Sequence, residues 1–251
     1  MWRLLAAFLS CMALAIAAPA SASIGTPVNQ GTAEDSSGGV FIIDTTLANA
    51  TAGSLMFIQY SVNSSSGTVP VCADGLGNVY TNGDTTGAPT VGYQWAFYSI
   101  LTAPVPSGTV ITCTQAGITA NKTIQVLSAS GIGAYDAPRS TSGGFATASS
   151  ATNSTGSPLA NANSLVLAWG AVVGNATTVT NSGGWTLVNS AGTATGTHAT
   201  VSYQIVASTA SVTITQTYGS SVGWSLGEQV FGASASAAAT PHNLLTLGAG
   251  G

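Results

Sequence analysis

Residues 223–227 read Gly-Trp-Ser-Leu-Gly and match G-x-S-x-G, the pattern that holds the nucleophilic serine of α/β-hydrolases on a strand-to-helix turn. A serine hydrolase also needs an acid and a histidine, and the only ones downstream of Ser225 are Glu228 and His242. Glu228 follows the serine too closely to be a separate triad member, and "GEQVFGA" continues as a strand rather than a helix. We therefore predict that Ser225 is an ordinary strand residue, that there is no catalytic residue, and that the protein is not an enzyme.

A turn rich in oxygen donors is the second candidate site. The segment "ADGLGNVYTNGD" (73–84) supplies Asp74, Asn78, Asn82 and Asp84, whose oxygens suit Ca²⁺. The segment lacks the D-x-D-x-D-G register, and Asp/Asn/Gly turn chemistry explains its residues equally well. We predict a weak calcium site here at most. His198 and His242 are isolated, so no confident metal site and no cofactor are predicted.

Aromatic side chains are the third candidate. Tyr80, Trp185 and Tyr218 lie beside turns and could stack on sugar rings if they are exposed. The other aromatic residues mostly alternate within strands, where core packing is the commoner explanation. These three residues therefore carry the hypothesis of glycan binding.

The elements that would position these residues are strands. Val, Ile, Thr and aromatic residues alternate in short runs that Gly, Asn, Ser and Pro interrupt, and the chain after residue 22 shows no helical apolar period. The predicted fold class is all-β, an antiparallel β-sandwich of jelly-roll-like type. The expected strands are 54–62, 93–101, 108–115, 122–130, 164–173, 199–207, 211–218 and 223–231.

The sequence also predicts two similar halves. "AGSLMFIQYSV" is similar to "ANSLVLAWGAV", and "WAFYSILTAPVPSGTVITCTQ" is similar to "VSYQIVASTASVTITQTYGS", in the same order along the chain. The sequence leaves open whether the halves form one sandwich or two packed domains. The predicted boundaries are a signal peptide at 1–22, a first β half at 23–138, a linker or edge segment at 139–158, a second β half at 159–233 and a low-complexity tail at 234–251.

The N-terminus predicts export. Arg3, the apolar run "LLAAFLSCMALAIAA" and Ala20-Ser21-Ala22 have the layout of a secretory signal; an uncleaved anchor is the alternative. Cleavage would leave Cys72 and Cys113, an even number in an oxidising compartment. We predict that they form a disulfide; two free buried thiols are the alternative.

The low content of charged residues limits the classes of partner that the protein can bind. Only 4% of residues are charged, and the chain after residue 22 has two cations, Lys122 and Arg139, against seven acids, a net charge of −5. Nucleic acid is excluded as a partner, because binding it requires several cations at phosphates. No further segment is apolar enough for a membrane span, so no membrane contact is expected after cleavage.

Several of these segments together resemble a known family. "AGSLMFIQYSV", "DGLGNVYTN", "YSILTAPVPSGTVITCT", "SLVLAWGAV", "GGWTLVNS" and "GWSLGEQVF" are similar to an uncharacterised family of secreted bacterial and phage-encoded β-sandwich proteins. The resemblance implies a jelly-roll-like sandwich on a surface or virion and no activity.

These observations lead us to expect a secreted, non-enzymatic structural or adhesive protein of the cell surface or extracellular space. It would associate with itself or with an extracellular surface or glycan. A carbohydrate-binding module and a phage virion appendage or decoration protein are the alternatives.

Overall fold

The structure is a computed structural model, and it describes most of the chain between residues 22 and 235. The described ranges are 22–35, 38–45, 49–64, 67–88, 92–137, 140, 145–156, 158–173, 178–192 and 197–235. The predicted signal peptide and C-terminal tail, with His242, therefore lie almost entirely outside the described residues. Among the residues that are described, no helix is long and apolar enough to cross a bilayer.

The described chain is all-β, as predicted, and its sheets are antiparallel and open. The strands are β1 (Val28–Asp35), β2 (Gly38–Thr45), β3 (Leu55–Val62), β4 (Val71–Ala73), β5 (Thr81–Ala88), β6 (Gly92–Ile100), β7 (Thr109–Thr119), β8 (Lys122–Ala129), β9 (Ile132–Tyr135), β10 (Phe145–Ser154), β11 (Ser164–Val173), β12 (Val179–Asn181), β13 (Thr186–Gly192), β14 (Thr197–Val206) and β15 (Thr213–Ala233).

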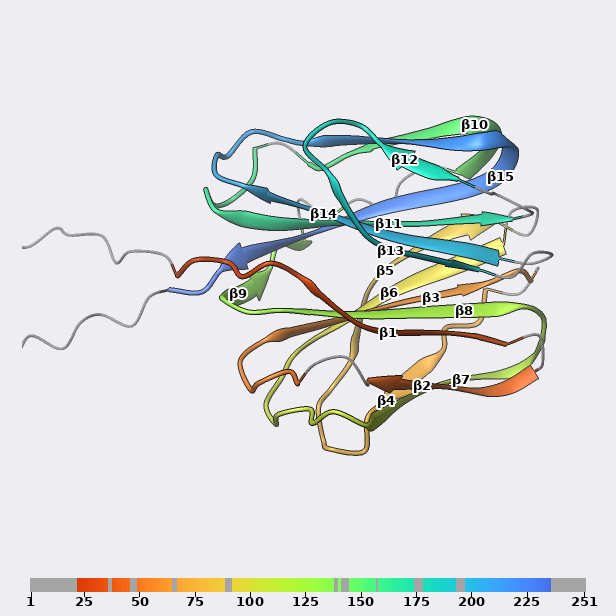
Figure 1. The fold of residues 1–251 in the computed structure, drawn as a ribbon, viewed down its shortest axis with the longest axis horizontal. Helices are drawn as coiled ribbons and strands as arrows, with labels where there is room; N and C mark the ends of the chain where they lie inside the picture. The colour runs from red at the N-terminus through yellow and green to blue at the C-terminus, as the bar shows by residue number, and fades with distance from the viewer. Residues whose placement is uncertain are drawn as a thin grey trace, which may run out of the picture.

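Three sheets hold these strands in a stack of layers. The five-stranded sheet has the order β1-β8-β3-β6-β5, and a three-stranded sheet, β2-β7-β4, covers one of its faces. The seven-stranded sheet has the order β10-β15-β11-β14-β13, and β12 and β9 also pair with β15. From bottom to top, Figure 1 shows β2, β7 and β4, then the five-stranded sheet, then β11, β13 and β14, and finally β10 and β12.

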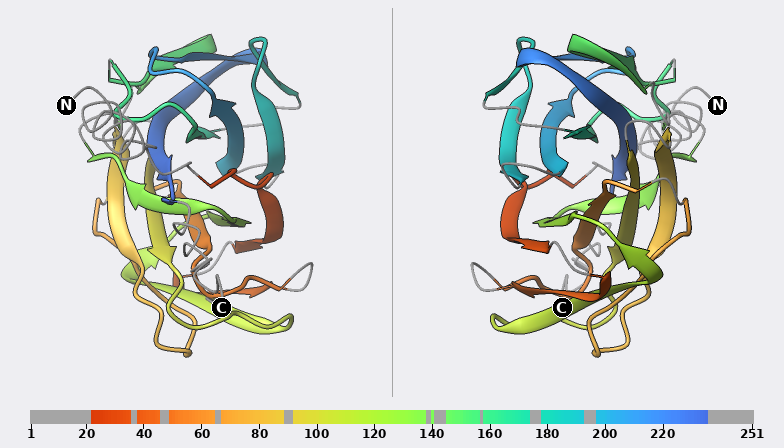
Figure 2. Two further views of the ribbon diagram at one scale, coloured as in Figure 1. Left: turned by 90° about the vertical axis from the view of Figure 1, so that its left-hand side faces the viewer. Right: turned by 90° about the vertical axis from the view of Figure 1, so that its right-hand side faces the viewer.

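β15 is long because it belongs to two layers. Its first part, residues 213–218, pairs with β12 and with the second half of β10. Its last part pairs with the start of β10 through residues 222–225 and with β11 and β9 through residues 223–233. Figure 2 shows the strand curving from the outer layer down to the inner one. The seven-stranded sheet therefore folds over on itself and encloses a core of its own.

Three hydrophobic cores lie between the layers. The lower core separates the five-stranded sheet from β2-β7-β4 and includes Tyr60, Trp95 and Ile111. The middle core joins the five-stranded sheet to β11, β14 and β15 and includes Phe57, Trp169 and Phe231. The upper core lies inside the folded seven-stranded sheet and includes Val166, Trp185 and Trp224.

The middle position of the five-stranded sheet explains the unbroken run "LMFIQYSV" in β3. Successive side chains of a strand point to opposite faces. Met56 and Ile58 enter the lower core, whereas Leu55 and Phe57 enter the middle core. All eight residues of β3 are buried, because both faces of the sheet are covered.

Buried amides connect the two central sheets. The side-chain nitrogens of glutamines in one sheet donate hydrogen bonds to backbone oxygens of the other, and these bonds fix how the sheets lie against each other. The pairs are Gln59 to Gly170, Gln94 to Trp169, Gln125 to Ala199 and Gln229 to Ala96.

All eight strands expected from the sequence are present, the last two as parts of β15. The expected strands did not include β1, β2, β4, β5, β9, β12 and β13, which apart from β2 are short or rich in Gly, Asn, Thr or Ala. β10 lies within the segment 139–158, for which the sequence left a linker and an edge segment open.

Candidate functional site

The outermost layer of the seven-stranded sheet presents rows of hydroxyl groups to solvent. In β10, Ser150 and Thr152 lie opposite Thr217 and Thr215 of β15, and Thr180 of β12 lies on the other side of Thr217. Residues between them, such as Ala151 and Gln216, point into the upper core. We call this surface the hydroxyl face, and its members are Ser150, Thr152, Ser154, Thr180, Ser182, Thr213, Thr215 and Thr217.

The side chains of the hydroxyl face are exposed, apart from the half-buried Ser182 and Thr215. Two cross-strand pairs hydrogen-bond to each other: the Oγ1 atoms of Thr152 and Thr215 lie 3.1 Å apart, and Oγ of Ser154 lies 2.7 Å from Oγ1 of Thr213. These pairs hold part of the surface in a regular arrangement across the paired strands β10 and β15.

An aromatic ring stands at one end of this surface. Phe145, the first residue of β10, is 52% exposed. It lies opposite Ser225 of β15, and a break in the β10–β15 register between Ala148 and Ser150 separates it from the rows of the hydroxyl face. Sequence reasoning did not count Phe145 among the candidate site residues, because it lies in a Gly/Ser-rich stretch that resembles a linker.

The opposite end of the stack has a different outer surface. On β4 and β7, the outward residues are Val71, Val110, Thr112 and Thr114, which we call the valine face. Val71 is 71% exposed and lies opposite Thr114. The two outer sheets thus expose different chemistry, one of hydroxyls and one of valine and threonine.

The three aromatic residues proposed for glycan stacking do not form one exposed row. Trp185 is 9% exposed and lies in the upper core, where its ring nitrogen donates to the carbonyl of Thr213. Tyr218 is buried in the same core, and burial raises the pKa of its phenol. Tyr80 is partly buried against the lower core, and burial followed by the neighbouring Asp74 raises its pKa.

Two of the residues proposed for calcium, Asp74 and Asn78, are hydrogen-bonded to each other and to neighbouring groups. Asp74 accepts from the backbone of Leu76, from the Asn78 amide and from the Tyr80 hydroxyl, so its two oxygens stabilise the turn. The Asn78 oxygen accepts from the backbone nitrogens of Thr102 and Ala103.

The other two members of the proposed calcium site, Asn82 and Asp84, lie on β5. Each bonds to Thr85, Asn82 through its side-chain nitrogen and Asp84 through an oxygen that accepts the Thr85 amide. Within the described ranges, no three residues of the types His, Cys, Asp and Glu cluster so as to hold a metal ion.

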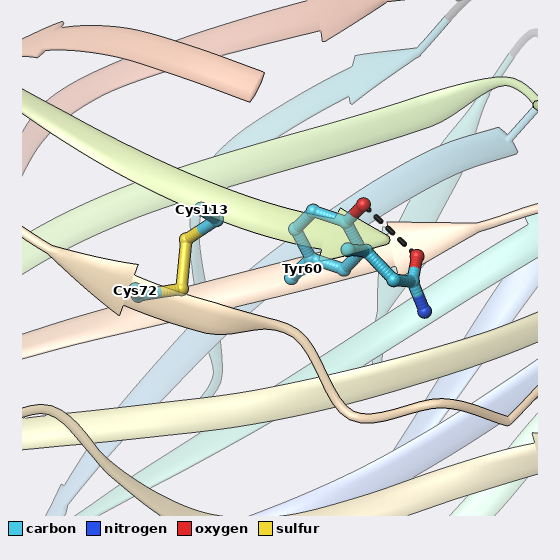
Figure 3. The surroundings of a disulfide bond; sticks show 4 residues. Tyr60, Cys72 and Cys113 are labelled. Atoms are coloured by element: carbon cyan, nitrogen blue, oxygen red, sulfur yellow. Dashed lines mark hydrogen bonds between the residues drawn. A yellow bond between two sulfur atoms is a disulfide. The ribbon is translucent and has the colours of Figure 1, made fainter. Parts of the chain in front are cut away.

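The predicted disulfide is confirmed. Cys72 of β4 lies directly opposite Cys113 of β7, and the two sulfur atoms are bonded beside the lower core (Figure 3). In the same region the Tyr60 hydroxyl donates to the side-chain oxygen of Gln115 at 3.0 Å, the dashed line in Figure 3. A structural disulfide indicates an oxidising environment.

Ser225 of the G-x-S-x-G match lies inside β15, with no strand-to-helix turn. It is 1% exposed, and its hydroxyl has no hydrogen-bond partner among the described residues. The predicted strand is confirmed, and its side chains alternate: Trp224 and Leu226 belong to the upper core, while Phe231 belongs to the middle core.

Glu228 shares the upper-core side of β15 and is fully buried. Neither of its carboxylate oxygens has a hydrogen-bond partner in the part of the chain that the structure describes. Burial raises the pKa of this carboxyl from 4.5 to about 8. A buried acid favours its neutral form, because an apolar core does not solvate the charge.

One serine and one histidine are hydrogen-bonded to each other. Oγ of Ser190 on β13 contacts Nε2 of His198 on β14, and both residues are half-buried. Burial lowers the pKa of His198, and the charge of Glu34 opposes that shift. The two residues are diagonal neighbours on paired strands, so the contact also joins β13 to β14.

Comparison with known proteins finds no matching family model, no matching curated protein and no matching solved structure. The family resemblance suggested by the sequence therefore stays a prediction.

Proposed function

We propose that this protein is a secreted, non-enzymatic structural or adhesive component of an extracellular surface, and that the hydroxyl face is its contact surface. The observation that carries the proposal is an exposed sheet face built from eight Ser and Thr side chains of three neighbouring segments. β10, β12 and residues 213–217 contain no charged residue. Such a face can form many hydrogen bonds without removing a charge from water.

We further infer that the chain is built from two equivalent halves, each a small sandwich. The order β1-β8-β3-β6-β5 corresponds to β9-β15-β11-β14-β13, and β2-β7-β4 corresponds to β10-β15-β12. The jelly-roll-like character predicted from the sequence is part of this proposal.

Irregularities of the strands support the same correspondence. β5 shifts its register against β6 between Asn82 and Asp84, and β13 shifts its register against β14 between Leu187 and Asn189. In both strands the side-chain oxygen of the residue after the shift accepts a hydrogen bond from the backbone nitrogen of the next residue. The distance is 2.7 Å from Thr85 to Asp84 in β5 and 2.8 Å from Ser190 to Asn189 in β13. β-Bulges are conserved within protein families, so a bulge at the same place in both halves favours a common origin of the halves.

The correspondence also relates the two outer faces. The pair Cys72 and Cys113 occupies the place of Asn181 and Gln216, which are hydrogen-bonded across β12 and β15. Counting from these pairs along the strands gives the matches between the outward residues. Val71 matches Thr180, Val110 matches Thr213, Thr112 matches Thr215, and Thr114 matches Thr217.

The second half therefore carries threonine at two outward positions where the first half carries valine. Valine and threonine have nearly the same shape and both favour strands, so the fold accepts either. At these two positions the faces differ in hydroxyl groups alone. This supports the second half as the end of the molecule that makes polar contacts.

The test places charge on each outer face in turn. The double variant Thr215→Lys/Thr217→Lys alters the hydroxyl face, and Thr112→Lys/Thr114→Lys alters the matched positions of the valine face. We expect wild type to self-associate in sedimentation velocity or to co-sediment with bacterial cell-wall material, and only the first variant to lose this behaviour. Equal behaviour of the two variants, or no association of wild type in either assay, would overturn the proposal.

A further inference from the structure

We propose that the hydroxyl face binds the chain of a neutral polysaccharide, with Phe145 stacking on a sugar ring at one end. This inference rests on the proposed function and names the partner of the same surface. It is carried by four properties of the face: its donors and acceptors, its lack of charge, its size and its aromatic end.

The donors and acceptors suit a hydroxylated polymer. Each Ser or Thr hydroxyl can donate one hydrogen bond and accept two, as a sugar hydroxyl can. The rows of the face repeat at about 4.8 Å between strands and about 6.8 Å along a strand. The pairing of Thr152 with Thr215 leaves free acceptor capacity on both oxygens, so the paired side chains stay available to a ligand.

The lack of charge selects a neutral polymer. A polyanion or polycation on this surface would bring charged groups into contact with hydroxyls and apolar strand atoms without any opposite charge. β10, β12 and residues 213–217 supply no Lys, Arg, His, Asp or Glu. Neutral hydroxyls therefore match the face, whereas a charged polymer would lose hydration without gaining an ion pair.

The size of the face argues against a second copy of this chain as its partner. Three strands and three rows at the usual spacings cover on the order of 300 Å². A stable protein–protein interface buries about 800 Å² on each partner. A polysaccharide chain of a few sugar units can bind a surface this small, and repeated weak contacts along the polymer raise the affinity through avidity.

Phe145 supplies the apolar part of the contact. An aromatic ring at a solvent-exposed site can lie flat against the C–H face of a sugar, which complements hydrogen bonds to the sugar hydroxyls. The ring is about half exposed, and Phe145 begins the strand β10 that carries Ser150 and Thr152 of the hydroxyl face. The face therefore has an aromatic end and a hydroxyl body.

The experiment measures binding to insoluble cellulose, chitin and starch as neutral polymers, with alginate and polygalacturonate as anionic controls. Thr180→Val/Thr213→Val converts the hydroxyl face toward the valine face without changing side-chain shape, and Phe145→Ala removes the ring. Thr112→Val/Thr114→Val removes hydroxyls at the opposite end as the matched control. Thermal unfolding of every variant confirms that the fold is retained.

We expect wild type and the matched control to bind at least one neutral polymer. The double valine variant should lose about tenfold in affinity, as the loss of two net hydrogen bonds implies, and Phe145→Ala should lose a similar factor. Binding only to the anionic polymers, no binding, or equal binding by all variants would overturn the inference. A wild-type dimer that Thr180→Val/Thr213→Val abolishes, without polysaccharide binding, would overturn it in favour of self-association and leave the proposed function standing.

Discussion

Replacing Glu228 by glutamine should change how the stability of the protein depends on pH. Glu228 lies on β15 opposite Ala168, in the upper core, with no hydrogen-bond partner for either carboxylate oxygen among the described residues. Burial raises its pKa from 4.5 to about 8. The folded protein therefore holds this carboxyl in its neutral form at pH 7.

The sign of the effect follows from proton binding. Below about pH 4.5 the carboxyl is protonated in both the folded and the unfolded chain, and it contributes no pH dependence. Between pH 4.5 and about 8 the unfolded chain loses the proton while the folded chain keeps it, so the free energy of unfolding falls as pH rises. At about 1.4 kcal/mol for each pH unit, the loss reaches roughly 3 kcal/mol at pH 7 and about 5 kcal/mol above pH 8.

Urea unfolding followed by tryptophan fluorescence at about pH 4, 6 and 8 measures this loss. Near pH 4 we expect Glu228→Gln to lie within about 1 kcal/mol of wild type, because both side chains are then neutral. Near pH 8 the variant should be more stable than wild type by several kcal/mol. Glu34→Gln, which removes an exposed acid from β1, controls for the change in net charge.

Parallel pH dependence of wild type and Glu228→Gln would refute the reasoning, since it would mean that the carboxyl ionises as easily in the folded chain as in the unfolded one. Glu228→Val provides a second check. Val126 of β8 occupies the corresponding place in the first half, opposite Ile58. The valine variant should also lose the slope between pH 4.5 and 8, whatever the change of side chain does to its stability at every pH.

Two further predictions concern stability. Replacing Cys72 and Cys113 by alanine removes a link between residues 41 positions apart, and it should lower the free energy of unfolding by about 3–4 kcal/mol in chemical denaturation; an unchanged midpoint would contradict a structural role. In Gly227→Ala the added carbon would lie 2.5 Å from the buried ring of Trp169, so we expect a loss of roughly 1–3 kcal/mol and a lower melting temperature. Gly183→Ala, where the added carbon meets open space, is the control and should change stability by less than about 0.5 kcal/mol.

The central strands could be predicted because both of their faces are buried. A strand such as β3 or β11 contacts a core on each side, and its sequence is then almost continuously apolar. Edge strands such as β10, "FATASSATNS", bury only a few small side chains, so their sequence resembles a loop. Their conformation is set by pairing with a neighbour far along the chain, which a local pattern does not contain.

The candidate site was harder to predict for a related reason. Trp185 and Tyr218 lie beside turns, but the turn does not decide whether a ring faces solvent. The folding of the seven-stranded sheet over itself places both rings in the upper core. Phe145 is exposed because β10 is the outermost strand of that sheet, a fact of topology rather than of local sequence.

The hydroxyl face itself could be read from the alternation Thr213, Thr215, Thr217, but its meaning depends on the comparison with the valine face. On the correspondence proposed above, Val71 and Val110 stand where Thr180 and Thr213 stand, and both sets of positions face solvent. Since valine is accepted there, neither the strand conformation nor the stability of the sheet requires the hydroxyl groups. The contact with a partner proposed above would explain why the second half carries hydroxyl groups at these positions.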